Sequence, residues 1–149
     1  RAGKLSAIVT QNIDGLHQAA GSKNVFELHG SVHRNYCQKC GKFFDVNYVV
    51  NAKGVPYCDE CGGIIKPDVV LYEEGLDSQT INGAVRAISK ADMLIIGGTS
   101  LVVYPAAGMI DYFKGKYLAV LNRDATSRDK QADLCITDPI GEVLGRIRV

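Results

Sequence analysis

The sequence predicts an α/β fold: a doubly wound parallel sheet with a small metal-binding insertion. Short apolar runs alternate along the chain with segments of helical spacing, and strands that alternate with helices form parallel sheets. This alternation stops between residues 33 and 66, where four cysteines stand in two Cys-x-x-Cys pairs. We therefore expect a sheet domain of residues 1–32 and 67–149, with residues 33–66 forming a zinc-ribbon subdomain inserted into it.

The individual elements follow from spacing and from turn residues. Apolar residues recur with helical spacing across Ser78–Lys90, which predicts a helix there. Met93–Ile96 is a continuous apolar run, typical of a strand buried on both faces. A last helix is expected to begin with Pro139 at its first position and Asp138 as its cap, and to run towards Ile147. The other expected elements are strands at Leu5–Thr10, Val69–Tyr72, Tyr117–Leu121 and Leu134–Ile136, and a helix at Pro105–Phe113.

The two cysteine pairs predict a structural zinc site. Cys37 and Cys40 form the first pair, and Cys58 and Cys61 form the second. Their separation lies in the window of four-thiolate zinc sites, because two intervening residues let one tight turn aim both sulfurs at one point. A closed shell of four thiolates leaves no position for water or substrate, so this zinc would be structural. Two disulfides or unrelated thiols are the alternative, but nothing else indicates an oxidising compartment, and we expect a cytoplasmic protein.

Composition limits the classes of partner. The chain has 149 residues, of which 46% are hydrophobic and 22% charged, and its formal net charge is +1. Proteins that grip nucleic acid usually carry a basic excess, so we expect no nucleic-acid partner. No apolar run approaches the about 20 residues of a membrane span, so we expect no membrane partner either. The fifth cysteine, Cys135, is expected to be a small buried hydrophobe.

Glycines and hydroxyls at one strand end predict a phosphate site. Gly98, Thr99 and Ser100 follow the strand expected at residues 93–96, and backbone N–H groups beside glycines can approach a phosphate closely. Asn122 ends the next strand, 24 positions after Gly98, where a Rossmann-like unit needs a polar group for a ribose. A glycine turn followed by a helix cap is the alternative for this segment.

A second polar set follows the first expected strand. The run Thr10–His17 holds amides and a carboxylate that can bind a carboxamide and sugar hydroxyls, although Asn and Asp also favour ordinary turns. His29 ends a short apolar run and precedes a glycine. A histidine suits proton transfer near neutral pH, while a structural hydrogen bond is the alternative role for this side chain.

Taken together, these segments resemble the sirtuins, a family of NAD-dependent protein deacylases, and the chain is most similar to bacterial members. The resemblance covers essentially the whole chain and keeps the order and spacing of the family's motifs. These motifs are the run Thr10–His17, the run Glu27–Ser31, the two cysteine pairs, Lys66–Val70, Gly98–Leu101 and Asn122.

The resemblance implies a protein lysine deacetylase that uses NAD and releases nicotinamide and O-acetyl-ADP-ribose. His29 would be the general base. Asp14 and the backbone of Ile13 would hold the nicotinamide carboxamide, and Gln11 and Asn12 would serve the ribose and an ordered water. The partner would be a protein or peptide that carries an acylated lysine.

The resemblance also implies roles at the other end of the cofactor. Gly98, Thr99 and Ser100 would contact the phosphates and the adenine ribose. Asn122 would bind the hydroxyls of that ribose, and Cys135 would contact the adenine through its backbone.

The resemblance finally implies where the peptide binds. The carbonyl of Val70 would accept from the acyl-lysine N–H, and Tyr72 would line the lysine tunnel. The extended segment Lys66–Glu74 would pair with the substrate as an added strand. The family usually has Phe-Gly-Glu where this chain reads Tyr72-Glu73-Glu74, and the extra negative charge at Glu73 would favour basic substrates.

One departure from the family bears on activity. Sirtuins begin with a strand, a Gly-Ala-Gly loop and a Pro-Asp-Phe-Arg segment, and none of these precedes Arg1. We therefore expect the chain by itself to bind NAD weakly and to show no measurable deacylation. The alternative function is a catalytically inactive, zinc-binding module for protein contact. A nucleic-acid-binding ribbon is less well supported, because residues 33–66 carry only scattered basic side chains.

Overall fold

The computed structural model describes residues 3–148, which fall into two compact units. The first unit is Ile8–Ile81, and the second runs from Asn82 onward and includes the residues before Ile8. Each unit has its own sheets and is described by itself. Among residues 3–148, no helix combines the length and the apolar character needed to cross a membrane.

The first unit begins with a short parallel pair of strands. β1 (Ile8–Thr10) pairs with β2 (Val25–Glu27), and α1 (Leu16–Ala19) lies in the connection between them. The expected first strand is thus real, but it begins at Ile8 rather than Leu5. A left-handed glycine, Gly15 with φ 68°, precedes α1.

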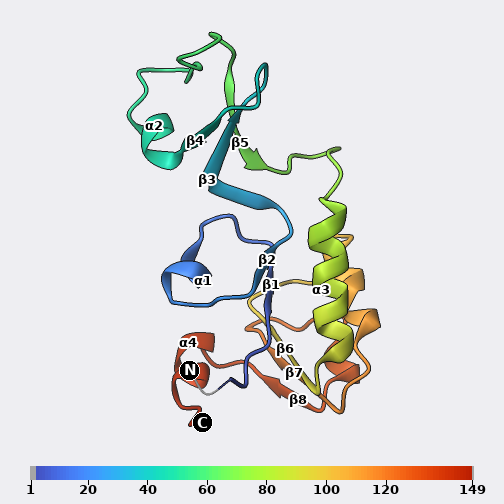
Figure 1. Ribbon diagram of the computed structural model, residues 1–149. Helices are drawn as coiled ribbons and strands as arrows, with labels where there is room; N and C mark the ends of the chain where they lie inside the picture. The colour runs from blue at the N-terminus through green and yellow to red at the C-terminus, as the bar shows by residue number, and fades with distance from the viewer. Residues whose placement is uncertain (1–2, 149) are drawn as a thin grey trace. The chain divides into compact units, whose positions relative to one another are not determined.

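The first unit also contains a three-stranded antiparallel sheet (Figure 1). Its central strand β3 (Gly30–Cys37) pairs with β4 (Phe43–Asp45) on one side and with β5 (Ile65–Val69) on the other. α2 (Val46–Val50) follows β4. The expected strand at residues 69–72 is wrong: only Val69 belongs to a strand, because the pairing with β3 ends there. The buried hydrophobic cluster of this unit consists of Cys37, Phe44, Cys58 and Ile65.

A large bulge interrupts the pairing of β3 with β5. Ser31 lies opposite Asp68 of β5, and Asn35 lies opposite Pro67, the residue that directly precedes Asp68. Residues 32–34 therefore have no backbone pairing partner on β5. The buried Asn35 side chain spans the bulge, since its Nδ2 donates to the carbonyls of Val32 (3.1 Å) and Phe44 (3.4 Å). Pro67 is tolerated because β5 is an edge strand.

The second unit contains a three-stranded parallel sheet. Its strand order is β6 (Met93–Gly97), β7 (Tyr117–Leu121) and β8 (Leu134–Ile136). α3 (Ser78–Lys90) precedes β6 and begins in the first unit. Ile96, Leu118 and Val120 form the buried cluster of this unit. These parallel strands and the helices between them confirm the predicted α/β class.

The helices after β6 differ from the sequence expectation in detail. The segment expected as a helix at residues 105–113 is a 3-10 helix, η1 (Ala106–Tyr112), and η2 (Asp129–Gln131) is a second short 3-10 turn. The last helix, α4 (Ile140–Gly145), has Pro139 as its N-cap residue. The expectation that Pro139 is the first helical residue, capped by Asp138, is therefore wrong. With ψ 123°, Pro139 is extended, and no side chain caps this helix.

Candidate active site and metal centre

The four cysteines of the two Cys-x-x-Cys pairs converge on one point in the first unit. All four sulfurs lie within 4.8 Å of one another, with 3.4 Å between Cys37 and Cys61 and 3.7 Å between Cys40 and Cys58. Four sulfurs around a tetrahedral zinc are about 3.8 Å apart. A disulfide needs about 2.05 Å, so the geometry fits a zinc ion and excludes the alternative of two disulfides.

Two matching turns supply these sulfurs. Gly41 N donates to Cys37 O (2.9 Å) and Gly62 N donates to Cys58 O (3.0 Å), and both glycines have positive φ. Gly63 lets the turns approach, because a Cβ there would lie 2.8 Å from the Cys37 sulfur. The metal centre therefore follows directly from the spacing of cysteines and glycines.

The four thiols lie so close together that each affects the ionisation of the others. A bound cation would reduce the repulsion between neighbouring thiolates. Backbone N–H donation from Cys40, and also from Lys39, lowers the pKa of Cys37 to about 6. Lys42 N–H donates to Cys40 and lowers the pKa of that thiol, but the Cys61 sulfur and burial raise it to about 12. Four adjacent thiols cannot all ionise without a positive charge between them. A zinc ion supplies that charge.

The loop that follows β1 is anchored through its own backbone carbonyls. Four carbonyls of residues 10–14 face hydrogen-bonding groups of residues 28–33, so the backbone of this loop has little freedom. The pairs are Leu28 N to Thr10 O (2.9 Å), His29 Nδ1 to Gln11 O (3.1 Å), Val32 N to Ile13 O (3.1 Å) and His33 Nε2 to Asp14 O (3.0 Å).

The contact at His29 selects one tautomer of its ring. The Gln11 carbonyl can only accept a hydrogen bond, so Nδ1 of His29 carries the proton that is donated to it. In the neutral ring, Nε2 then keeps its lone pair. The side chain is partly buried. This is the arrangement that a general base requires: one nitrogen oriented by the protein and the other able to take a proton.

The backbone of His29 is tied to the segment expected to bind peptide. Val70 N donates to His29 O at 3.1 Å. Between them the strands approach so closely that a Cβ at Gly30, where φ is 77°, would lie 1.8 Å from the carbonyl oxygen of Asp68. Gly30 is therefore required, and it brings the predicted base and Val70 together.

The residues after Val70 form a turn. Glu74 N donates to Leu71 O at 3.1 Å, and Glu73 has φ 72°. Donation from Leu71 N, and then the ammonium of Lys66, holds the pKa of Glu74 below its usual range. The side chain of Tyr72 is fully exposed. A left-handed Glu73 occupies a turn position that normally suits glycine.

Sequence reasoning missed His33. Besides holding the Asp14 carbonyl, its ring packs against Gly15, where a Cβ would lie 2.7 Å from His33 Cδ2. Nothing local distinguishes this histidine, because its role depends on a contact 19 residues back in the chain.

In the second unit, the three parallel strands end together. Gly97, Leu121 and Ile136 are in register. The residues that follow continue the ladder, since Gly98 N donates to Leu121 O (3.1 Å) and Asn122 N donates to Ile136 O (3.0 Å). The predicted phosphate and ribose residues thus share the carboxyl edge of one sheet, which is where α/β sheets bind ligands.

The groups at this edge differ in how open they are. Gly98 has φ 62° and nothing within 4 Å of a Cβ position. The Thr99 hydroxyl accepts from Leu101 N at 3.2 Å, and Asn122 Nδ2 donates to Asp124 O at 2.9 Å. Backbone approach is therefore open at Gly98, while Thr99 and Asn122 also stabilise their own turns.

Ser100 and Cys135 are both exposed. The expectation that Cys135 is a buried hydrophobe is wrong: it lies on β8, an edge strand of the sheet, and its thiol contacts Asp129 O at 3.7 Å. Within the described residues, the predicted site thus forms two groups, one in each unit. Gln11, Asn12, Ile13, Asp14, His29, Val70 and Tyr72 form the first, and Gly98, Thr99, Ser100, Asn122 and Cys135 form the second.

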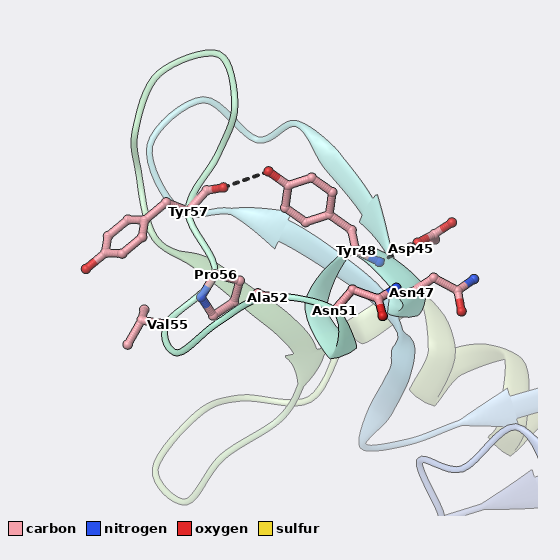
Figure 2. A pocket seen from close by; sticks show the side chains of 8 residues that line it. All are labelled: Asp45, Asn47, Tyr48, Asn51, Ala52, Val55, Pro56 and Tyr57. Atoms are coloured by element: carbon pink, nitrogen blue, oxygen red, sulfur yellow. Dashed lines mark hydrogen bonds between the residues drawn. The ribbon is translucent and has the colours of Figure 1, made fainter.

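An open concavity of about 520 Å³ lies on the zinc-ribbon part of the first unit. Figure 2 shows Tyr48 donating its hydroxyl to the carbonyl of Tyr57, at 3.0 Å. The one carboxylate that lines the concavity belongs to Asp45, which caps α2 by accepting from Tyr48 N. None of the predicted site residues lines it. The lining residues are Asp45, Asn47, Tyr48, Asn51, Ala52, Val55, Pro56 and Tyr57.

Comparison with known proteins decides the family. A family model described as "Sir2 family" matches residues 1–105. The chain belongs to the Sir2 family. An NAD-dependent protein deacetylase of Clostridium acetobutylicum is 68% identical over 143 residues, which cover 95% of this chain and 58% of that protein. The corresponding deacetylase of Clostridium perfringens is 67% identical over 146 residues, 97% of this chain and 60% of that protein.

Solved Sir2 structures share the fold. One is a complex with the inhibitor EX-527, 2′-O-acetyl-ADP-ribose and a deacetylated p53 peptide, at TM-score 0.87 and 40% identity; the match covers 95% of this chain and 63% of that one. Another is Sir2 bound to an acetylated peptide, at TM-score 0.85 and 38% identity, with 95% and 62% covered. The chain thus spans about 58–60% of the length of these Clostridium relatives.

Proposed function

We propose that this chain carries the base and substrate-binding part of an NAD-dependent protein lysine deacetylase. The observation that carries the proposal is His29, whose Nδ1 is held by the Gln11 carbonyl while its backbone carbonyl accepts from Val70 N. A base with a fixed tautomer thus lies in the chain segment that also positions the proposed acyl-lysine-binding residue. The names of the Sir2 relatives support the same activity.

His29 takes a proton at Nε2 in this proposal. The Gln11 carbonyl orients the ring, because it accepts the Nδ1 proton throughout. Val70 offers its carbonyl to the acyl-lysine N–H, and Tyr72 lies beside the lysine. The segment Lys66–Glu74 pairs with an extended peptide, a mode that takes its affinity from main-chain hydrogen bonds.

The chain's own residues divide the binding of NAD into two parts. Bound NAD would supply a ribose carbon that accepts the acyl oxygen as nicotinamide leaves. Asp14 and the Ile13 backbone hold the carboxamide, and Gln11 and Asn12 serve that ribose; the anchored carbonyls of residues 10–14 fix this backbone.

The adenosine part of NAD belongs to the second unit in this proposal. Gly98, Thr99 and Ser100 bind phosphate and ribose, because the backbone at Gly98 is open to close approach. Asn122 binds the ribose hydroxyls, and the backbone of Cys135 contacts the adenine.

The zinc has a structural role in this proposal, since four thiolates close its coordination shell. Reduced thiolates persist in the cytoplasm, where we place the protein. We also propose the domain limits given above, residues 33–66 within 1–32 and 67–149. The antiparallel sheet itself begins at Gly30 and ends at Val69.

His29→Ala in the complete, zinc-loaded protein tests the proposal. We expect turnover of an acetylated peptide to fall about 10²–10⁴-fold, the usual contribution of a general base. NAD affinity and the melting temperature should change little, because the other three anchored carbonyls of the loop keep their partners. Turnover near the wild-type rate would show that His29 is a structural histidine. Absence of turnover in the wild-type protein would favour the inactive binding module.

A further inference from the structure

We propose that Arg34 is a positioning residue for this deacetylase, a clamp that sets the spacing between the base segment and the peptide segment. The inference rests on the proposed function. Arg34 contacts neither reacting group directly. It acts through two carboxylates, Glu27 and Asp68, each of which lies two residues before a proposed site residue.

The contacts of Arg34 join three strands. From β3, its Nη1 donates to Glu27 Oε2 on β2 at 2.7 Å, and its Nε donates to Asp68 Oδ2 on β5 at 2.8 Å. β2 belongs to the parallel pair and β5 to the antiparallel sheet. A planar guanidinium can bind two carboxylates in fixed directions, which an ammonium cannot do. Arg34 therefore links the two sheets of the first unit with defined geometry.

The two carboxylates are unequal. The Glu27 side chain is only 8% exposed, whereas that of Asp68 is 46% exposed. A buried carboxylate that loses its partner keeps the cost of desolvation, while an exposed one regains water. The Glu27 contact should therefore carry most of the effect of the clamp, and the Asp68 contact should mainly fix its direction.

The bulge of β3 explains how Arg34 reaches both sides. Residues 32–34 have no backbone pairing partner on β5, and each of the three contacts a residue before β3. Val32 N reaches Ile13 O, His33 reaches Asp14 O, and Arg34 reaches Glu27. Bulges often re-aim side chains beside functional sites. Here the bulge directs three consecutive residues towards the segments that carry the proposed site.

The clamp acts beside the backbone pairing of β3 with β5. Glu27 lies two residues before His29, and Asp68 lies two residues before Val70. The bond from Val70 N to His29 O joins the two segments directly, at 3.1 Å. Arg34 joins the same two segments a second time, through Glu27 and Asp68. Without Arg34, that one hydrogen bond and the β3–β5 pairs at Gly30 and Ser31 would have to hold the base and the peptide-binding carbonyl in register.

Arg34→Met in the complete, zinc-loaded protein removes both contacts and keeps the apolar stem. We expect kcat/KM for an acetylated peptide to fall about 10- to 100-fold, because small misplacements of reacting groups have effects of that size. Both a lower kcat and a higher peptide KM should contribute. The KM for NAD should stay within about twofold, since Arg34 contacts no residue assigned to the cofactor.

Conservative and matched variants separate position from charge. Arg34→Lys can keep one carboxylate, so it should recover part of the loss. Asp68→Asn, at the exposed end, should cost less than Glu27→Gln. Arg146→Met is the control, because Arg146 forms an exposed ion pair with Glu142 at 3.6 Å, and neither residue has a role in the proposed site. This variant should leave kcat/KM within about twofold with zinc content unchanged.

Amide exchange tests the clamp without any activity. Arg34→Met should raise the exchange rate of the Val70 amide at least tenfold, while the Ile65 amide, bonded to Pro56 O at 3.0 Å, should be unchanged. If wild-type protein has no deacetylase activity, the proposed function fails and this measurement alone decides the clamp. Unchanged Val70 exchange in both Arg34 variants would overturn it. So would a kcat/KM within twofold of wild type for Arg34→Met in an active enzyme.

Discussion

The two units position their candidate residues in different ways. In the first unit, long-range hydrogen bonds hold individual atoms in place: four carbonyls of residues 10–14 are anchored, and one of them orients the His29 ring. In the second unit, the candidate residues simply continue three parallel strands that end in register, and Gly98 faces open space. One unit depends on specific long-range hydrogen bonds, and the other depends on sheet geometry.

The difference matches the chemistry proposed for each unit. Proton transfer needs a base whose nitrogen is fixed within hydrogen-bond reach of its target. Binding of a phosphate needs several backbone N–H groups and room for close approach. The first unit should therefore be sensitive to any change that moves its strands, and the second should be sensitive mainly to changes that fill its open edge.

Loss of zinc should affect the first unit far more than the second. Cys58→Ser removes a buried ligand, and structural zinc sites contribute on the order of 10 kcal/mol. We expect zinc content well below half an equivalent and an unfolded antiparallel sheet. Metal analysis and amide exchange of β3 and β7 measure both effects. Cys135 is an exposed cysteine outside the cluster. The control variant Cys135→Ser should therefore keep one zinc per chain. A folded β3 without metal would contradict the structural role.

Alanine substitutions at two glycines, one in each unit, should have the next largest effect, and the loss of stability should differ between them. Gly30→Ala places a Cβ 1.8 Å from Asp68 O, whereas Gly98→Ala meets nothing within 4 Å. Both have positive φ, which costs about 1 kcal/mol in a non-glycine residue. We therefore expect Gly30→Ala to destabilise by about 3 kcal/mol, with overpacking added, and Gly98→Ala by about 1 kcal/mol. Denaturant unfolding measures both losses. Equal losses would remove the contrast between the units.

Glu73 should show the smallest effect, and one of opposite sign. Its φ of 72° predicts that Glu73→Gly stabilises the protein by about 1 kcal/mol, because the left-handed conformation no longer costs free energy. Glu73→Gln keeps the strain and removes the charge, so stability should be unchanged while preference for basic peptides falls. Denaturant unfolding and competition between acetylated peptides measure the two effects. If both variants are equally stable, the turn is not strained.

Three regular elements, α3, β7 and β8, were predictable to the residue. Periodicity and apolar runs predicted the limits of α3, β7 and β8, because these elements are set by local pattern. The predicted start of α4 was wrong, because Pro139 is the N-cap residue and has an extended conformation. The zinc cluster was predictable because its spacing is itself the geometric requirement.

The supporting contacts of the first unit were not predictable. His33 and Arg34 looked like ordinary polar residues at the start of the zinc ribbon. Their roles depend on partners 19 and 34 residues away, Asp14 and Asp68. These contacts exist because β3 bulges, and no local pattern predicts a bulge of this size. The roles assigned to the individual site residues stay predictions until variants test them.

The bulge also determines where this chain can change its length. One residue removed from positions 32–34 would turn the remaining side chains to the opposite face of β3, so all three contacts would be lost together. The loop around Gly54 is different: a Cβ there meets nothing within 4 Å, and no strand or helix includes it. Insertions and deletions among homologues should therefore gather near Gly54 and be excluded from the bulge. The same loop is the natural position for a fused tag or reporter domain.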